Sequence, residues 1–149
     1  MPIMRVENMK DFADAMLELK NINSTTSTYT LNSHGTSGIV EDFECDPARF
    51  YIGDDRITYK TDFSILKDGL KGHNVFIGAC NIGSTRGNGF ELIEKMSGQT
   101  SSTVIASDHP LSAGYTYDGS NYLNITATIP QPAVVQNGYI ISSNGSSFN

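Results

Sequence analysis

The chain has 149 residues, of which 38% are hydrophobic and 17% are charged, and it carries a formal net charge of -6 at pH 7. This size and composition predict one globular domain with a single hydrophobic core. The negative charge argues against nucleic acid or an anionic membrane surface as the main partner, because both bind basic faces, and no apolar stretch approaches the roughly 18 residues of a membrane span.

The sequence begins MPIMRVE, which lacks the apolar run of a secretory signal peptide. We therefore expect a cytoplasmic protein, or one that is secreted by a route that needs no signal peptide. Release from a longer parent protein is a further alternative.

Four segments of the first half have clear local patterns. Residues 7–20 have apolar side chains at helical spacing and predict an amphipathic helix. The β-forming residues of 28–33 predict a strand. The segment 36–58 predicts short hairpin strands joined by a glycine-containing turn. Asp62 is a candidate cap for a helix over 63–71.

The middle of the chain continues with alternating strands and helices. A continuous apolar run at 75–77 predicts a central strand that is buried on both faces. A helix over 87–98 and a strand over 102–106 follow. This alternation predicts an α/β sandwich with a largely parallel sheet and flanking helices.

The last third of the chain has a different pattern. Residues 115–117 and 122–128 are typical of strands and predict an antiparallel hairpin with a turn at 118–120. Residues 138–141 predict an edge strand, and residues 142–149 are expected to be loose.

The chain has two cysteines, Cys45 and Cys80. Neither lies in a Cys-x-x-Cys pattern and no His-x-x-x-His pattern accompanies them, so we predict no metal site and no cofactor. Acidic residues flank Cys45 on both sides, which would raise the pKa of its thiol and make it a poor nucleophile. Cys80 closely follows the apolar run at 75–77 and is the better candidate.

Three reactive side chains come after predicted parallel strands: His34, Cys80 and Asp108. Because the carboxyl ends of parallel strands meet at one edge of a sheet, we expect these residues to lie at the same edge. His73 precedes the central strand and is expected at the opposite edge. His109 is a weaker candidate base than His34.

A histidine beside a cysteine can perform nucleophilic catalysis. The imidazole of His34 would take the proton of the Cys80 thiol and later protonate the leaving amine. The backbone N–H groups of Gly35 and Cys80 are candidate donors to the oxyanion of a tetrahedral intermediate. A serine hydrolase is less favoured, because the sequence has no Gly-x-Ser-x-Gly pattern.

Two blocks of sequence, YTLNSHG at 29–35 and VFIGAC at 75–80, resemble the signature blocks of the caspase-like (clan CD) cysteine peptidases. The interval between His34 and Cys80 agrees with the caspase spacing of about 50 residues. The residues around Cys80 differ from the Gln-Ala-Cys-Arg-Gly of caspases, and Gly78 stands where metacaspases have an aspartate. The chain therefore resembles the clan but not the caspases in the narrow sense.

The resemblance covers roughly residues 26–108. It implies a single caspase-like domain over residues 1–149, built as a three-layer sandwich with an antiparallel β extension at 114–142. It also implies a cysteine endopeptidase that acts on a protein or peptide substrate, with His34 as general base and acid and Cys80 as nucleophile.

Members of the clan usually select their substrates by one charged or polar side chain. Asp108 is the candidate for binding a lysine or arginine side chain of the substrate, and three other loop carboxylates are alternatives: Asp46, Asp54 and Asp55. Arg86 is closer to Cys80 and could meet a substrate carboxylate instead, although we favour a surface role for it.

The sequence leaves three roles open. The chain can be an active peptidase, such as a bacterial toxin or effector with an inhibitor or immunity protein as its partner. It can be a catalytically inactive caspase-like module that binds another protein. It can also be a protease that cuts itself or its parent protein.

Overall fold

The computed structural model describes the chain in the following ranges: 3–21, 28–33, 35–36, 38, 46–79, 82, 87–107, 121–126, 139–143 and 146–148. The helices of these ranges are α1 (Met9–Asn21), the 3-10 turn η2 (Ser64–Leu66), α2 (Lys67–Leu70) and α3 (Gly89–Thr100). No helix in this part of the chain has the length and apolar character needed to cross a membrane.

The strands of the described ranges form two sheets. The larger sheet contains, in spatial order, β1 (Ile3–Val6), β8 (Asn121–Thr126), β2 (Thr28–Asn32), β6 (Asn74–Gly78), β7 (Thr103–Ser107), β9 (Tyr139–Ser143) and β10 (Ser146–Phe148). The smaller sheet contains β3 (Gly35–Thr36), β4 (Arg49–Ile52) and β5 (Asp55–Ile57).

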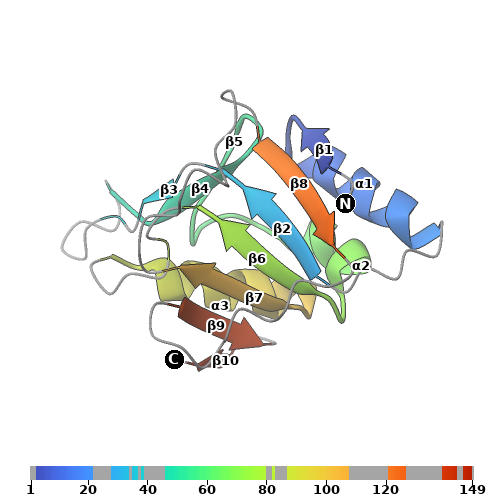
Figure 1. Ribbon diagram of the computed structural model, residues 1–149. Helices are drawn as coiled ribbons and strands as arrows, with labels where there is room; N and C mark the ends of the chain where they lie inside the picture. The colour runs from blue at the N-terminus through green and yellow to red at the C-terminus, as the bar shows by residue number, and fades with distance from the viewer. Residues whose placement is uncertain are drawn as a thin grey trace.

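The larger sheet is mixed (Figure 1). Its central strands β2, β6 and β7 are parallel to one another, whereas the pairs on either side of them are antiparallel. The protein is therefore a mixed α/β structure. The expectation of a largely parallel sheet is correct for the three central strands and wrong for the strands that flank them.

All the described helices pack on one face of the larger sheet. The register aligns Tyr29 of β2 with Val75 of β6, and Val75 with Val104 of β7, so their side chains share a face. These three residues belong to one buried cluster with side chains from every described helix: Phe12, Met16, Leu66, Leu70, Leu92, Ile93 and Met96.

The handedness of the connections explains this single layer of helices. From β2 to β6 to β7 the chain moves across the sheet in one direction. Right-handed crossovers in one direction all pass over the same face, and helices reach the second face only where the direction reverses. The described residues therefore do not form the expected three-layer sandwich with helices over both faces.

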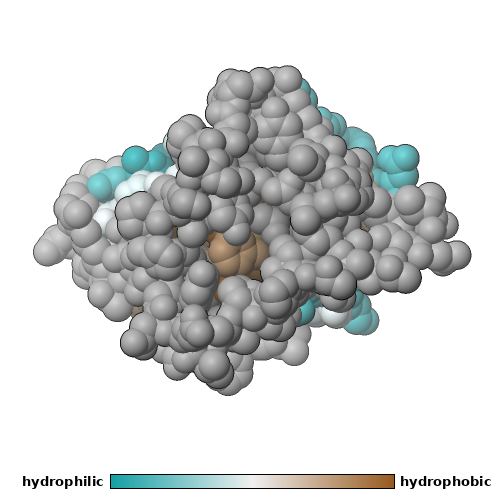
Figure 2. Space-filling view, in the orientation of Figure 1, coloured by the Kyte–Doolittle hydropathy of each residue, from teal (hydrophilic) through white to brown (hydrophobic). Residues whose placement is uncertain are grey.

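The opposite face of the sheet carries Phe76 and Ile105, which are partners across β6 and β7. Both are buried, and both lie outside the cluster that the helices cover. The helices lie behind the sheet in Figure 1, so this face is turned toward the viewer. In Figure 2, which has the same orientation, a hydrophobic area reaches the surface near the centre, and hydrophilic residues lie toward the rim. The prediction that residues 75–77 are buried on both faces is confirmed.

The local elements predicted for the first two-thirds of the chain are confirmed, with small shifts at their ends. Helices α1 and α3, strands β2, β6 and β7, and the β4–β5 hairpin lie where the sequence predicts them. The helix predicted over 63–71 is the turn η2 followed by α2. Close to its start, the Oδ1 atom of Asp62 accepts the backbone N–H of Ser64 at 3.0 Å.

The predictions for the tail were wrong in their strand pairing. Strand β8 lies between β1 and β2 and pairs antiparallel with both, while its predicted partner at 115–117 lies outside the described residues. Strand β9 pairs with β7 and with β10, so the described residues within 142–148 belong to the sheet and are not loose. The short strand β1 was not predicted, because four residues are too few to show a period.

Gly69 of α2 packs directly on Met16 of α1, and a Cβ atom added at Gly69 would collide with the Cβ atom of Met16. The overpacking in Gly69→Ala should cost about 1–3 kcal/mol, because the packed helices would have to move apart. The higher helix propensity of alanine offsets about 1 kcal/mol of this cost, so we expect a net loss in the free energy of unfolding of up to about 2 kcal/mol. Urea unfolding measures the change. Lys67→Ala at an exposed position of the same helix is the control, and equal stability of the two variants would contradict the close approach.

Candidate active site at the strand ends

The carboxyl ends of β2 and β6 lie side by side. The parallel register sets Asn32, the last residue of β2, opposite Gly78, the last residue of β6. The pairing continues one residue further, because the backbone N–H of Ser33 donates to the carbonyl oxygen of Gly78 at 3.2 Å. The residue before His34 is therefore bonded to the strand that leads to Cys80.

Gly35 makes the second contact between the segment around His34 and the segment around Cys80. A Cβ atom added at Gly35 would lie 2.8 Å from the Cβ atom of Ala79 and 2.9 Å from the Cδ1 atom of Ile82. Ala79 directly precedes Cys80 and Ile82 follows it by two residues. The described residues on both sides of His34 therefore lie against the described residues on both sides of Cys80.

His34, Cys80 and Asp108 themselves lie outside the described residues, as do Cys45, Arg86 and His109. Their roles stay predictions. Gly35 is described, and as part of β3 it is paired with Phe50 of β4. His73 directly precedes β6, at the opposite end of the strand from Ala79, and its ring lies 4.9 Å from the ring of Tyr29 between centroids.

Strand β4 holds the segment around His34 on both sides. Before the histidine, the Oγ atom of Ser33 accepts the backbone N–H of Tyr51 at 2.8 Å, and Ser33 is only 6% exposed. After the histidine, Gly35 is the register partner of Phe50. Tyr51 and Phe50 are neighbours within β4, so one strand positions both flanks of His34.

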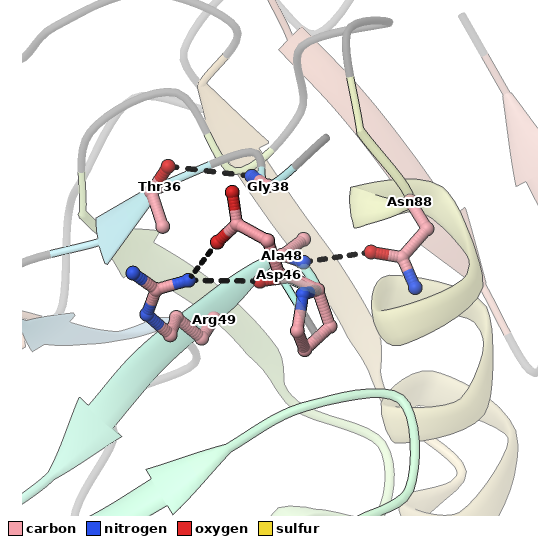
Figure 3. Close-up of polar contacts among 7 residues, drawn as sticks. Thr36, Gly38, Asp46, Ala48, Arg49 and Asn88 are labelled. Carbon is pink, nitrogen blue, oxygen red and sulfur yellow. Dashed lines mark hydrogen bonds and ion pairs between the residues drawn. The ribbon is translucent and has the colours of Figure 1, made fainter. Parts of the chain in front are cut away.

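Asp46, a candidate for an acidic substrate pocket, has a basic partner within the protein. Its Oδ1 atom lies 2.7 Å from the Nη1 atom of Arg49, which also donates to the carbonyl oxygen of Pro47 at 3.2 Å (Figure 3). The hydrogen bond from Arg49 to Asp46 is the main reason why the pKa of the guanidinium is raised. A substrate cation would have to compete with Arg49 for this carboxylate.

Asp55, another carboxylate of that set, also has a partner within the protein. The Oδ2 atom of Asp55 accepts the backbone N–H of Met9 at 2.8 Å, at the start of α1. Asp54 is exposed, and its backbone N–H donates to the carbonyl oxygen of Glu7 at 2.8 Å. Of the four carboxylates proposed from the sequence, Asp46 and Asp55 are engaged, and Asp108 is not described.

Asn88 is a buried polar residue of this region that the sequence analysis did not select. It is only 1% exposed, and its Oδ1 atom accepts the backbone N–H of Ala48 at 2.7 Å (Figure 3). Its Nδ2 atom is buried without a hydrogen-bond partner, as is the Oε2 atom of Glu91 one turn later. The run Gly87-Asn88-Gly89 before α3 was the signal in the sequence, because asparagine between glycines is typical of a helix start.

Gly38 lies against the same segment and has a left-handed backbone, with φ at +70°. A Cβ atom at this position would collide with the backbone of residues 46–48. The backbone N–H of Gly38 donates to the Oγ1 atom of Thr36 at 3.3 Å. Gly38, just after β3, and the segment 46–48, just before β4, are therefore packed backbone to backbone.

Within the described ranges, no three His, Cys, Asp or Glu side chains gather in a group that could hold a metal ion. No protein-family model, no curated protein and no solved structure matches the chain. The resemblance to the caspase-like peptidases therefore stays a prediction from the two sequence blocks.

The contact of Gly35 with Ile82 predicts an energetic coupling between the two segments. We expect Gly35→Ala to lower the free energy of unfolding by about 1–3 kcal/mol, because the added methyl group overlaps Ala79 and Ile82. Ile82→Val removes the Cδ1 atom and costs about 0.5–1.5 kcal/mol on its own. In the double variant the losses should sum to less than their separate values, which urea unfolding measures as a double-mutant cycle. Additive losses would contradict the contact.

The burial of the Glu91 carboxyl should make the stability of the protein depend on pH. Burial, with a smaller contribution from the charge of Glu94, raises the pKa of the Glu91 carboxyl above its ordinary value. Folding therefore favours the protonated form, and this stabilisation is complete below the ordinary pKa of about 4.3 and is lost as the pH rises through the raised value. The thermal midpoint of Glu91→Gln should therefore rise relative to that of the wild-type protein as the pH increases from 4 to 7. If the two midpoints differ by the same amount at pH 4 and at pH 7, the pKa of the carboxyl is not raised.

Proposed function

We propose that the chain is a caspase-like cysteine endopeptidase that cleaves peptide bonds with a dyad of His34 and Cys80. The observation that carries this proposal is the pairing of the strand ends, in which Ser33 bonds to Gly78 and Gly35 lies against Ala79. Consecutive Cα atoms are about 3.8 Å apart, and His34 and Cys80 directly follow Ser33 and Ala79 in the sequence.

The chemistry of the dyad follows from the two side chains. The imidazole of His34 accepts the proton of the Cys80 thiol, and the thiolate attacks the carbonyl carbon of the scissile bond. The oxyanion that forms accepts hydrogen bonds from the backbone N–H groups of Gly35 and Cys80. The imidazolium then donates its proton to the leaving amine, and His34 activates a water molecule that hydrolyses the thioester.

The fold gives partial support to membership of the caspase-like clan. The proposal is supported by three parallel strands with helical crossovers, of which the neighbours β2 and β6 end shortly before the histidine and the cysteine in the sequence. The proposed three-layer sandwich has one of its helix layers among the described residues, the layer of α1, α2 and α3.

Substrate choice and biological role are further parts of the proposal. Asp108 is the candidate that we favour for binding a basic substrate side chain, since Asp46 is paired with Arg49 and Asp55 accepts the backbone N–H of Met9. An effector or toxin that cleaves a protein in another cell, restrained by an inhibitor or immunity protein, fits a small peptidase of this kind. Self-processing would use the same dyad. For the localisation we propose the cytoplasm or, as the alternative, secretion by a signal-peptide-independent route.

Thiol alkylation tests the dyad directly. A free thiol with a pKa of about 8.5 is only about 1% thiolate at pH 6.5, whereas a thiol beside an imidazolium is mostly thiolate. We expect iodoacetamide to modify Cys80 at least about tenfold faster than Cys45 at pH 6.5. His34→Ala should remove this difference, and His73→Ala, at the opposite end of β6, should not. Peptide mapping by mass spectrometry gives both rates.

The same samples separate the peptidase from the inactive module. Wild-type protein should cleave members of a mixed peptide library that the Cys80→Ala variant leaves intact. If Cys80 reacts no faster than Cys45 and the rate is independent of His34, the chain is not an enzyme of this type, and the protein-binding module becomes the better interpretation.

A further inference from the structure

Asn88 occupies the end of the segment that begins at Cys80. Helix α3 connects β6 to β7, two parallel neighbours, so it runs back along the sheet and begins at the edge where β6 ends. Asn88 is the residue immediately before this helix. Its position therefore belongs to the candidate active-site edge, although it is eight positions beyond the cysteine.

The side chain of Asn88 is not used in the way its position predicts. Asparagine before a helix normally accepts a backbone N–H of the first turn of that helix. Asn88 makes no such bond to α3. Its Oδ1 atom instead accepts the backbone N–H of Ala48 at 2.7 Å, and the two residues are 1% and 0% exposed (Figure 3). The side chain thus joins two segments that are 40 positions apart in the sequence.

Ala48 leads directly into β4, the strand that holds both flanks of His34. Tyr51 of β4 donates to the Oγ atom of Ser33, and Phe50 is the register partner of Gly35. A connection therefore runs from Asn88 through Ala48 to β4, and from β4 to Ser33 and Gly35 on the two sides of His34. It is separate from the direct pairing of Ser33 with Gly78.

We propose that Asn88 is a positioning residue, which fixes the segment carrying Cys80 relative to the segment carrying His34. This inference rests on the proposed dyad and adds a residue that the sequence blocks do not contain. Asn88 acts through the bond to Ala48 and does not touch the reacting atoms. Its loss should change the reactivity of the Cys80 thiol and its pH profile, which depend on the imidazole, more than a loss of stability alone would.

Asn88→Ser is the main test variant, because serine also caps helices but its shorter side chain does not reach Ala48. Asn88→Ala is the second variant. Gln99→Ala is the matched control, since the Oε1 atom of Gln99 accepts the backbone N–H of Phe63 at 2.7 Å at the other end of α3. The Asn88 variants and Gln99→Ala thus each remove an amide oxygen that accepts a hydrogen bond from the backbone of a neighbouring segment.

The measurement is the rate of Cys80 alkylation from pH 5 to pH 9. We expect Asn88→Ser and Asn88→Ala to lower the rate at pH 6.5 by about tenfold or more, with the midpoint moving toward the ordinary thiol value of about 8.5. Gln99→Ala should keep the wild-type rate and midpoint. Asn88→Asp, which keeps an acceptor oxygen for Ala48, should recover most of the rate.

A failure of the proposed dyad and a failure of the positioning role of Asn88 give different results. If His34→Ala leaves the wild-type rate of Cys80 unchanged, the proposed dyad itself fails. If the rate depends on His34 but the serine and alanine variants of Asn88 match Gln99→Ala, the dyad stands and the positioning role of Asn88 is overturned.

Discussion

The parallel pairing of β2 with β6 is the interaction on which the candidate site depends. Its register sets Asn32 opposite Gly78, and the bond from Ser33 extends it to the residue before His34. A shift of one residue would turn the side chains of β2 to the opposite face of the sheet. Tyr29 and Leu31 are buried in the main cluster, so the hydrophobic effect opposes that shift. The core beneath the sheet therefore determines which residues meet at its edge.

A second set of contacts joins the same two segments from outside the larger sheet. Tyr51 of β4 donates to Ser33, and Phe50 of β4 is the register partner of Gly35. Ala48, just before β4, donates to Asn88 at the head of α3. Each contact involves a buried group, and breaking a buried hydrogen bond typically costs about 1–3 kcal/mol. Two independent connections restrict the relative motion of two strand ends more than either connection alone, which suits a site that needs a fixed geometry.

The sequence predicted the elements that carry a local signal and failed where the partner is distant. The apolar runs of β6 and β7 identified the parallel centre, and the blocks around His34 and Cys80 identified the edge. The insertion of β8 between β1 and β2 was not predictable, because its partners in both strands are 90 or more positions away in the sequence. Asn88 was missed for a related reason: its position predicts a cap for its own helix, whereas its bond goes to Ala48.

The distance between the Cys80 sulfur and the nearer ring nitrogen of His34, measured in a crystal of the wild-type protein, tests the central claim most directly. The dyad predicts about 3–7 Å, since a working hydrogen bond is about 3 Å long and unliganded enzymes are often looser. A separation well beyond about 7 Å, with both side chains ordered and no mobile loop between them, would contradict the account.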